Sequence, residues 1–358
     1  MREERQSAKD DIDELAPGVR RLQLPIDMPG LGHVNCYILD DKNGAALVDP
    51  GLPGKAAWDA LVKGLARADL KVKDIHTVVI THSHPDHFGG AGRLQREAGA
   101  KIITHDNFRF FWDTADDNKD SIDSVEDAAD NDPLLDDPAY SGRDTGPFGT
   151  TPWGGEKHQL PARRRFGYWL MKHGVARRFM PTANPTSRVA DADYIKLADR
   201  DFVAVHTPGH TVDHLCLFDP EGGIMIAGDH VLPTITPHIS GMGIARDPLK
   251  QYFESLDRMK TFTETKTVLP AHGHPFSDLS GRVDAIKIHH GERLDILREA
   301  GETLGEATVG DYMKKLFKER SWGSMAESET FAHLEHLRLV GDASAVRRDD
   351  GMLVYTLD

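Results

Sequence analysis

Short apolar runs alternate with helical spacing along the N-terminal part of this 358-residue chain. Alternating or continuous apolar stretches predict strands, whereas residues 55–70 place Ala57, Leu61 and Leu65 at the spacing of a helix. A second helix is expected from about Ala91. The predicted strands cover residues 18–26, 33–39, 45–48, 76–80 and 101–104. This alternation of strands and helices is typical of a layered α/β domain.

The apolar pattern breaks down between about residues 106 and 200. An acidic segment, residues 113–144, holds twelve acidic and two basic side chains, and a basic segment, residues 163–178, holds six basic ones and no acid. Because irregular stretches of this length often form lids or binding loops, we interpret residues 106–200 as an insertion that sets specificity. The basic segment would bind an anionic tail, such as that of coenzyme A, or pair with the acidic segment. The aromatic residues of the insertion would line an apolar pocket or belong to the core. They are Phe108, Phe110, Phe111, Trp112, Trp153, Tyr168 and Trp169.

Strand-like runs resume after the insertion. Four more strands are expected, at residues 202–206, 215–218, 224–227 and 268–269, and a helix over residues 281–300. Two helices then follow, 309–317 and 327–339, before two short strands around the turn Asp349-Asp350-Gly351. Helix, helix and hairpin is the pattern of a winged-helix module. We therefore predict a main domain over residues 1–300 and a small winged-helix-like domain over residues 301–358.

The charge of the chain narrows the classes of partner. Its formal net charge is −14 at pH 7, and residues 305–358 carry seven basic and ten acidic side chains. Affinity for nucleic acids depends largely on neutralising phosphates, so we expect no nucleic-acid partner. The C-terminal module is then expected to serve packing or homodimer formation.

Apolar runs and cysteines bear on location. No apolar run is long enough to span a membrane, and the polar residues 1–17 lack the pattern of a signal peptide. Cys36 and Cys216 both lie in strand-like runs, which is typical of reduced core thiols. We expect a cytoplasmic protein that acts on a small molecule without a membrane partner.

Residues 81–87 contain four candidate metal ligands. They read Thr-His-Ser-His-Pro-Asp-His and directly follow the predicted strand 76–80. A loop leaving a buried strand can direct His82 and His84 to one metal ion, and Asp86 and His87 to another. Imidazole and carboxylate ligands suit zinc, iron or manganese.

Three further candidates repeat this arrangement, because each comes at the end of a predicted strand. They are His210, Asp229 and His272. Since strand ends converge on one rim of a sandwich, ligands that are distant in the sequence can meet there.

Together with Asp49, these motifs occur in the order that characterises the metallo-β-lactamase superfamily, and the chain resembles that family over about its first 300 residues outside the insertion. The resemblance implies an αββα sandwich that holds two divalent metal ions, most simply Zn²⁺. It assigns His82, His84 and His210 to the first metal. It assigns Asp86, His87 and His272 to the second, makes Asp229 the bridge between them, and makes Asp49 a hydrogen-bond partner of a ligand imidazole.

Two close metal ions can share a water molecule and lower its pKa towards neutrality. We expect the resulting bridging hydroxide to attack a carbonyl group, with Asp86 as a catalytic residue that orients it and handles its proton. His238 is a second catalytic candidate, as proton donor or substrate contact; the alternative is a structural hydrogen bond. His214 and His230 are expected behind the ligands or in the core, and His274, His289 and His290 on the surface or in packing.

The overall arrangement resembles the lactamase-beta-2-type hydrolases. We favour hydrolysis of an ester or thioester of a small to medium organic molecule, with a metal-dependent nuclease as the alternative. A lactonase is a second alternative, which is weakened because Leu232 stands where quorum-quenching lactonases of the superfamily carry tyrosine. Glyoxalase II is less favoured, since no basic glutathione-binding pattern follows Asp229. Asp229 also replaces the cysteine of several true β-lactamases, which argues against antibiotic hydrolysis as the function. The second-site residues disfavour a mononuclear iron oxygenase of the same fold, since Asp86, His87 and His272 are all present.

Overall fold

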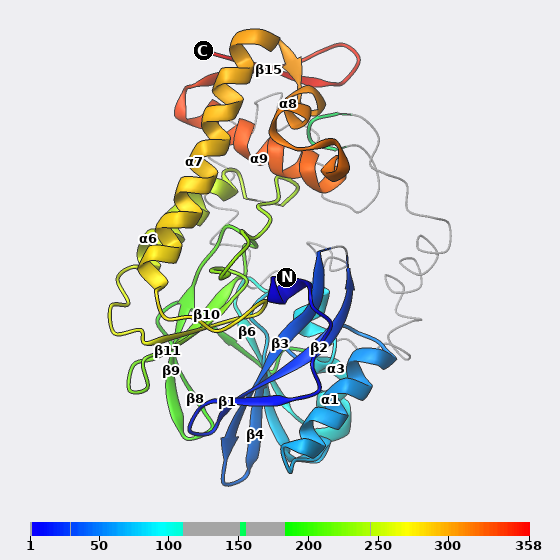
Figure 1. The fold of residues 1–358 in the computed structure, drawn as a ribbon, viewed down its shortest axis with the longest axis vertical. Coiled ribbons are helices and arrows are strands. Elements are labelled where there is room, and N and C mark those ends of the chain that lie inside the picture. The colour runs from blue at the N-terminus through cyan, green and yellow to red at the C-terminus, as the bar shows by residue number, and fades with distance from the viewer. Residues whose placement is uncertain (1, 29, 110–150, 155–182, 244) are drawn as a thin grey trace.

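A computed structural model describes residues 2–28, 30–109, 151–154, 183–243 and 245–358 (Figure 1). The acidic segment, the basic segment and five of the aromatic residues lie outside the described residues: Phe110, Phe111, Trp112, Tyr168 and Trp169. The roles predicted for them therefore stay predictions.

Seven strands form the first sheet and lie in it in sequence order. Neighbouring strands are antiparallel from β1 to β4 and parallel from β4 to β7. Their bounds are β1 (Ile12–Ala16), β2 (Val19–Met28), β3 (Leu31–Asp41), β4 (Gly44–Val48), β5 (Ile75–Val79), β6 (Lys101–His105) and β7 (Ser187–Val189). The five strands predicted before residue 105 are thereby confirmed.

Five strands form the second sheet, in the order β12-β11-β10-β9-β8. Its strands are β8 (Tyr194–Leu197), β9 (Arg200–His206), β10 (Leu215–Asp219), β11 (Ile224–Gly228) and β12 (Thr267–Pro270). Only the β11–β12 pair in this sheet is parallel. A cluster of buried apolar side chains joins the inner faces of the two sheets, among them Tyr37, Val48, Val79, Phe202, Leu217 and Leu269.

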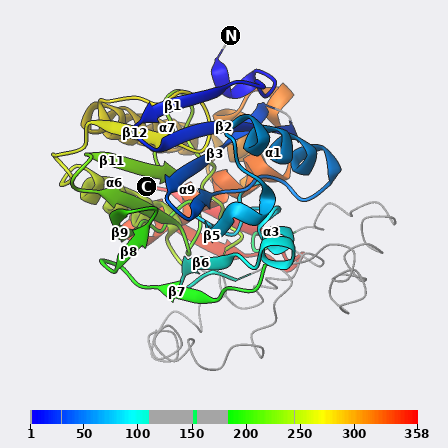
Figure 2. The same cartoon turned by 90° about the horizontal axis from the view of Figure 1, so that it is seen from below.

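Helices cover the outer faces of both sheets (Figure 2). The first sheet carries α1 (Lys55–Arg67) and α3 (Ala91–Ala98). On α1, the residues Ala57, Leu61 and Leu65 are buried, as their helical spacing predicts. The second sheet carries α6 (Pro248–Met259) and the first part of α7 (Leu279–Leu304). These layers confirm the αββα sandwich.

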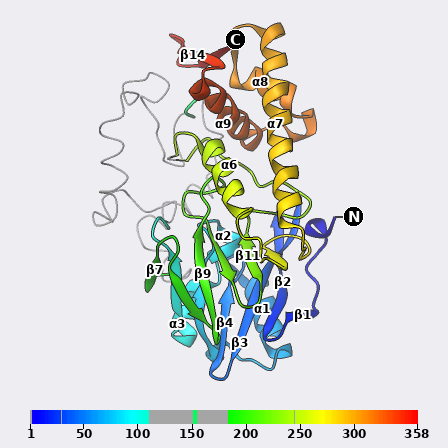
Figure 3. The same ribbon diagram turned by 90° about the vertical axis from the view of Figure 1, so that its left-hand side faces the viewer.

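The long helix α7 leads from the sandwich to a C-terminal module (Figures 1 and 3). This module contains β13 (Ala307–Thr308), α8 (Val309–Leu316), α9 (Ser324–Val340), β14 (Ala343–Arg347) and β15 (Leu353–Leu357). Its sheet has the order β13-β15-β14. The predicted helices and hairpin are confirmed as elements, while their assignment as a winged-helix domain stays a prediction.

One hydrophobic cluster spans the sandwich and the module. It includes Met225 on β11, Tyr252 on α6, Val283 on α7 and Leu334 on α9. Trp153, from the predicted insertion, belongs to the same cluster and packs against Phe331 with ring centroids 5.1 Å apart. The module therefore shares its core with the second sheet. The predicted boundary at residue 300 falls inside α7.

Besides the one-turn helix α2 (Pro85–Phe88), the two-residue strand β13 and the 3-10 helices, four elements were not expected from the sequence. β1 lies in the polar N-terminal stretch, and β7 and β8 lie within the predicted insertion, which therefore ends before Ser187. β8 buries Ile195 and Leu197 and exposes Tyr194, an alternation too short to stand out. The fourth is α6, although Asp247 accepts a hydrogen bond from Lys250 N at its start and is a usual N-cap residue.

Two composition-based predictions can be compared with the structure. Cys36 and Cys216 are buried and form no disulfide. Among the helices of the described residues, none is both long and apolar enough to cross a membrane.

Candidate metal centre

The candidate ligands lie at one end of the two sheets, on segments that follow strands. β5 ends at Val79, and the loop after it enters the one-turn helix α2 (Pro85–Phe88). Pro85 occupies the first helical turn, where its fixed φ and missing N–H are tolerated, and Asp86 and His87 follow it within the turn. From the second sheet, His210 follows β9, Asp229 follows β11 and His272 follows β12.

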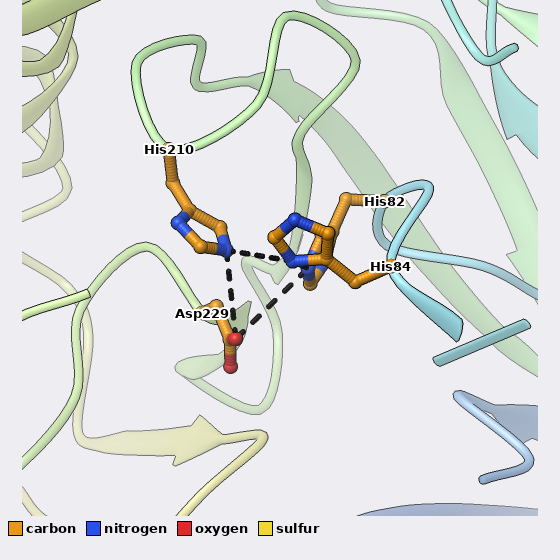
Figure 4. Close-up of side chains that lie close together, drawn as sticks. All are labelled: His82, His84, His210 and Asp229. Atoms are coloured by element: carbon orange, nitrogen blue, oxygen red, sulfur yellow. Dashed lines mark hydrogen bonds and ion pairs between the residues drawn. The ribbon is translucent and has the colours of Figure 1, made fainter. Parts of the chain in front are cut away.

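Four side chains form the first ligand group (Figure 4): His82, His84, His210 and Asp229. Their ligand atoms all lie within 4.8 Å of one another. His84 Nδ1 is 2.9 Å from His82 Nε2 and 3.1 Å from His210 Nε2. Asp229 Oδ2 is 3.6 Å from His210 Nε2 and 3.9 Å from His82 Nε2.

Three side chains form the second ligand group: Asp86, His87 and His272, again within 4.8 Å. Asp86 Oδ2 is 3.5 Å from the Nε2 atoms of both histidines. Asp229 reaches this group as well, because its Oδ1 is 3.4 Å from His272 Nε2 and its Oδ2 is 3.6 Å from His87 Nε2. The Asp229 carboxylate thus lies between the two groups, the place that the resemblance gives to a bridging ligand.

The nitrogen atoms of the first group fit a cation. His210 donates its Nδ1–H to the backbone carbonyl of His238 at 2.7 Å, and His82 Nδ1 lies 3.1 Å from Thr81 Oγ1. These bonds leave the Nε2 lone pairs of His82 and His210 directed at His84 Nδ1, which can donate a proton to only one of them. A metal ion would bind all three, and backbone or hydroxyl partners of this kind are typical behind ligand histidines.

The second group fits a cation on a different observation. Three buried atoms of this centre have no hydrogen-bond partner among the described residues: His87 Nε2, Asp229 Oδ1 and His272 Nε2. The described residues give them only ion-pair contacts of 3.4–3.6 Å. A buried polar atom without a hydrogen bond costs about 1–3 kcal/mol, more for a charged group, so such atoms need an explanation. A divalent cation in the centre would supply all three with a partner.

Asp49 holds the loop of residues 81–87 from behind. Its Oδ2 accepts hydrogen bonds from His87 Nδ1 at 2.8 Å and from Thr81 Oγ1 at 2.7 Å. Its Oδ1 accepts from the Thr81 backbone N at 2.8 Å. Asp49 therefore lies where the resemblance assigns it, against a ligand imidazole.

His214 supports Asp229 in a similar way. The backbone N–H of Asp229 donates to His214 Nε2 at 3.0 Å, and His214 Nδ1 lies 2.8 Å from Thr207 Oγ1. Gly228 has a φ of 49°, and a Cβ there would lie 2.6 Å from His214 Nε2. Only glycine fits between this imidazole and the candidate bridging carboxylate.

Burial keeps the imidazoles of the first group unprotonated. It lowers the pKa of His84 to about 3, lowers that of His82 well below its usual value, and also lowers that of His210. These imidazoles are neutral at pH 7, which is the protonation state that binds metals.

The second group balances charge in the absence of a cation. Burial opposes charge on His272, but Asp229 and Asp86 outweigh it and raise its pKa to about 10. Burial likewise opposes charge on Asp86, yet His87 and His272 hold the pKa of its carboxyl below the usual range. A metal ion that binds here must displace the imidazole protons.

The histidines outside the ligand groups occupy different environments. His238 lies beside the centre, but its Nδ1 is 3.3 Å from Glu329 Oε2 on α9, and its side chain is 21% exposed. His230 is buried with its ring centroid 5.2 Å from that of Tyr252. His274 is 61% exposed and pairs with Glu3, whereas His290 is fully buried.

Glu329 is a residue of this region that the sequence did not reveal. It is buried on α9 next to the centre, although glutamate in an amphipathic helix is usually solvent-exposed. Its position depends on how α9 packs against the sandwich, and no local sequence signal marks it.

Known proteins share the fold and parts of the sequence. A metallo-beta-lactamase family protein from Thermus thermophilus superposes with a TM-score of 0.71 and 26% identity, covering 96% of this chain and all of that one. Hydroxyacylglutathione hydrolase GloC of Haemophilus influenzae is 24% identical over 196 residues, 54% of this chain and 65% of its own length. Atrochrysone carboxyl ACP thioesterase of Cryptosporiopsis sp. is 33% identical over 95 residues, 26% of this chain and 27% of its own. The chain thus spans less than two thirds of these two curated relatives.

The His and Asp ligand groups lie at one end of an αββα sandwich, and the sequence relatives of this chain include hydrolases. Residues 29–272 match the Metallo-beta-lactamase superfamily, and the chain belongs to this family.

Proposed function

We propose that this protein binds two divalent metal ions, most simply Zn²⁺, and hydrolyses an ester or thioester of a small to medium organic molecule. The observation that carries this proposal is the place of Asp229. Its carboxylate lies 3.4–3.6 Å from ligand nitrogens of both groups, so a single side chain can join two metal ions. Iron and manganese accept the same ligand types.

When bound, such a metal pair lowers the pKa of a shared water molecule and polarises the bond to be cleaved. In this proposal Asp86 orients that water and accepts its proton, because its carboxylate belongs to the second ligand group and is only 7% exposed. Water oxygen bonds to the acyl carbon, the bond to the alcohol or thiol breaks, and the proton passes to the leaving group. His238 has only Nε2 left for a substrate, since Glu329 faces its Nδ1.

Two observations support an acyl substrate over a nucleic acid. Relatives of partial length carry the names hydroxyacylglutathione hydrolase and thioesterase. The chain has a net charge of −14, which opposes binding of a polyphosphate. These points favour an ester or thioester as the substrate.

Elemental analysis of the purified chain, combined with assays on ester, thioester, lactone and RNA substrates, tests the proposal. We expect about two metal ions per chain and turnover of an acyl substrate. Asp229→Ala should abolish both the binding of two metal ions and the turnover. Asp219→Asn is the matched control, because Asp219 is a buried carboxylate at the opposite end of the second sheet. One iron per chain with oxygen uptake, or turnover of RNA alone, would overturn the proposal.

A further inference from the structure

Helix α9 of the C-terminal module forms hydrogen bonds to a loop beside the candidate metal centre, residues 238–241. Gly241 N lies 3.2 Å from the Ser328 carbonyl oxygen and 3.1 Å from Ser328 Oγ, and donates to both. Ser240 Oγ lies 3.2 Å from Ser328 Oγ. One turn of α9 therefore fixes this loop through its backbone as well as through side chains.

The same loop touches a ligand of the first group. The backbone carbonyl of His238 accepts the Nδ1–H of His210 at 2.7 Å. This bond sets the tautomer and the ring orientation of His210, and so the direction of its Nε2 lone pair. Any displacement of the His238 backbone would move that lone pair.

Glu329 contacts the side chain of His238 in the same loop. It is 8% exposed, its Oε1 pairs with Arg293 of α7, and its Oε2 faces His238 Nδ1 at 3.3 Å. Two elements of the module side, α7 and α9, thus hold the side chain of the residue whose carbonyl orients His210.

A third group of potential ligands lies nearby but does not call for a metal. His290, His333 and Glu329 offer ligand atoms within 4.8 Å of one another. However, the two carboxylate oxygens of Glu329 already face Arg293 and His238, and His290 Nδ1 lies 3.0 Å from His333 Nε2. A cation there would meet the guanidinium group, so we interpret this group as part of the hydrogen-bonded support.

We propose that Ser328 and Glu329 are positioning residues for the metal centre, acting on His210 through loop 238–241. The inference rests on the metal-binding function proposed above, but not on the identity of the substrate. Hydrogen-bond partners behind a ligand typically contribute about 10- to 100-fold to metal affinity. Because Glu329 acts through one further residue, we expect the lower end, about tenfold, for its loss.

The test compares Glu329→Gln with Glu335→Gln in the full chain. Glu335 is the matched control, because it is also a buried glutamate on α9 and also pairs with an arginine, Arg338. Its other partner is Tyr355 OH at 2.6 Å, away from loop 238–241. Zinc affinity is measured by competition with a chromogenic chelator, and the thermal midpoint of the metal-free proteins is measured alongside.

We expect Glu329→Gln to weaken one of two zinc sites about tenfold, and to do so for the site that His82→Ala removes. Glu335→Gln should lower the thermal midpoint without changing either affinity. Ser328→Ala, a smaller change, should weaken the same site and speed amide exchange at Gly241 in the metal-free protein. It also provides the test if Glu329→Gln does not fold.

Unchanged zinc affinities in Glu329→Gln and Ser328→Ala, or equal losses in Glu335→Gln, would overturn the inference. A wild-type chain that binds no zinc would instead contradict the proposed function, so the two failures are distinguishable.

Discussion

Asp49 accepts the Nδ1–H of His87 at 2.8 Å while its own backbone has a φ of 57°. Residues other than glycine rarely adopt this left-handed conformation, and it costs about 1 kcal/mol or more. The three hydrogen bonds that the Asp49 carboxylate accepts offset this cost. The strained backbone is therefore linked to the orientation of a candidate metal ligand.

Replacing Asp49 by alanine should weaken metal binding at the second ligand group. His87 loses the acceptor that orients its ring, so we expect a loss of about 10- to 100-fold in affinity for one metal ion. Chelator competition measures this loss. Asp69→Ala is the control, because Asp69 has the same φ of 57° but is exposed. Equal affinities in the two variants would refute the role of Asp49.

The two ligand groups should be separable by mutation. His82→Ala removes a ligand of the first group only, and His272→Ala removes one of the second only. Each variant should keep about one metal ion per chain under conditions where the wild type keeps about two. Elemental analysis after dialysis against a weak chelator measures the content. Loss of both metals in each single variant would contradict two separable sites.

Asp213 should make the stability of the metal-free protein depend on pH. Burial raises the pKa of its carboxyl to about 6, above the ordinary value of 3.8. Between these values the folded state binds more protons than the unfolded state, so the free energy of unfolding falls as pH rises. Because the unfolded carboxyl is already partly ionised at pH 4, the expected loss from pH 4 to pH 7 is about 2 kcal/mol.

Denaturant unfolding of wild type and Asp213→Asn at both pH values measures this effect. The variant lacks the titrating group, so its stability relative to the wild type should rise between pH 4 and pH 7. A difference that is the same at both pH values would contradict the raised pKa.

The sandwich and the C-terminal module should unfold together. One hydrophobic cluster includes Met225 of the second sheet and Leu334 of α9, so neither part can lose its packing alone. Leu334→Ala should destabilise both by about 2–5 kcal/mol. Far-ultraviolet circular dichroism and amide exchange in β5 and α9 follow the two parts. Two transitions, of which the variant moves only one, would show that the module folds independently.

The clustering of the candidate ligand residues could be predicted because their signal is local. Residues 81–87 place four candidate ligands on one loop, and His210, Asp229 and His272 each follow an apolar run that ends at the same rim. The spacing of polar residues after strands thus carries the information needed to bring them together.

The support behind the ligands could not be predicted in the same way. Glu329 lies on α9, whose apolar residues Phe331, Leu334 and Leu337 indicate one buried face, yet the structure buries every residue from Ser328 to Glu335. Packing against α6 and α7 buries the other face. The apolar pattern of one helix does not reveal which other helices pack against it.

His290 shows a signal that the sequence did hold. It occupies a helical position between Ile286 and Leu294, both buried, and is itself fully buried. A polar residue on an apolar stripe of this kind predicts burial. Its hydrogen bond to His333 depends on a second helix and remains beyond such reasoning.

Each ligand group takes side chains from both sheets. His82 and His84 follow β5 in the first sheet and His210 follows β9 in the second, while Asp86 and His87 on one side meet His272 on the other. A bound cation is therefore a non-covalent cross-link between the two halves of the sandwich. Free metal at one hundred times its dissociation constant adds about 2.7 kcal/mol per site to the folded state. Metal starvation would then lower the amount of folded protein as well as its activity.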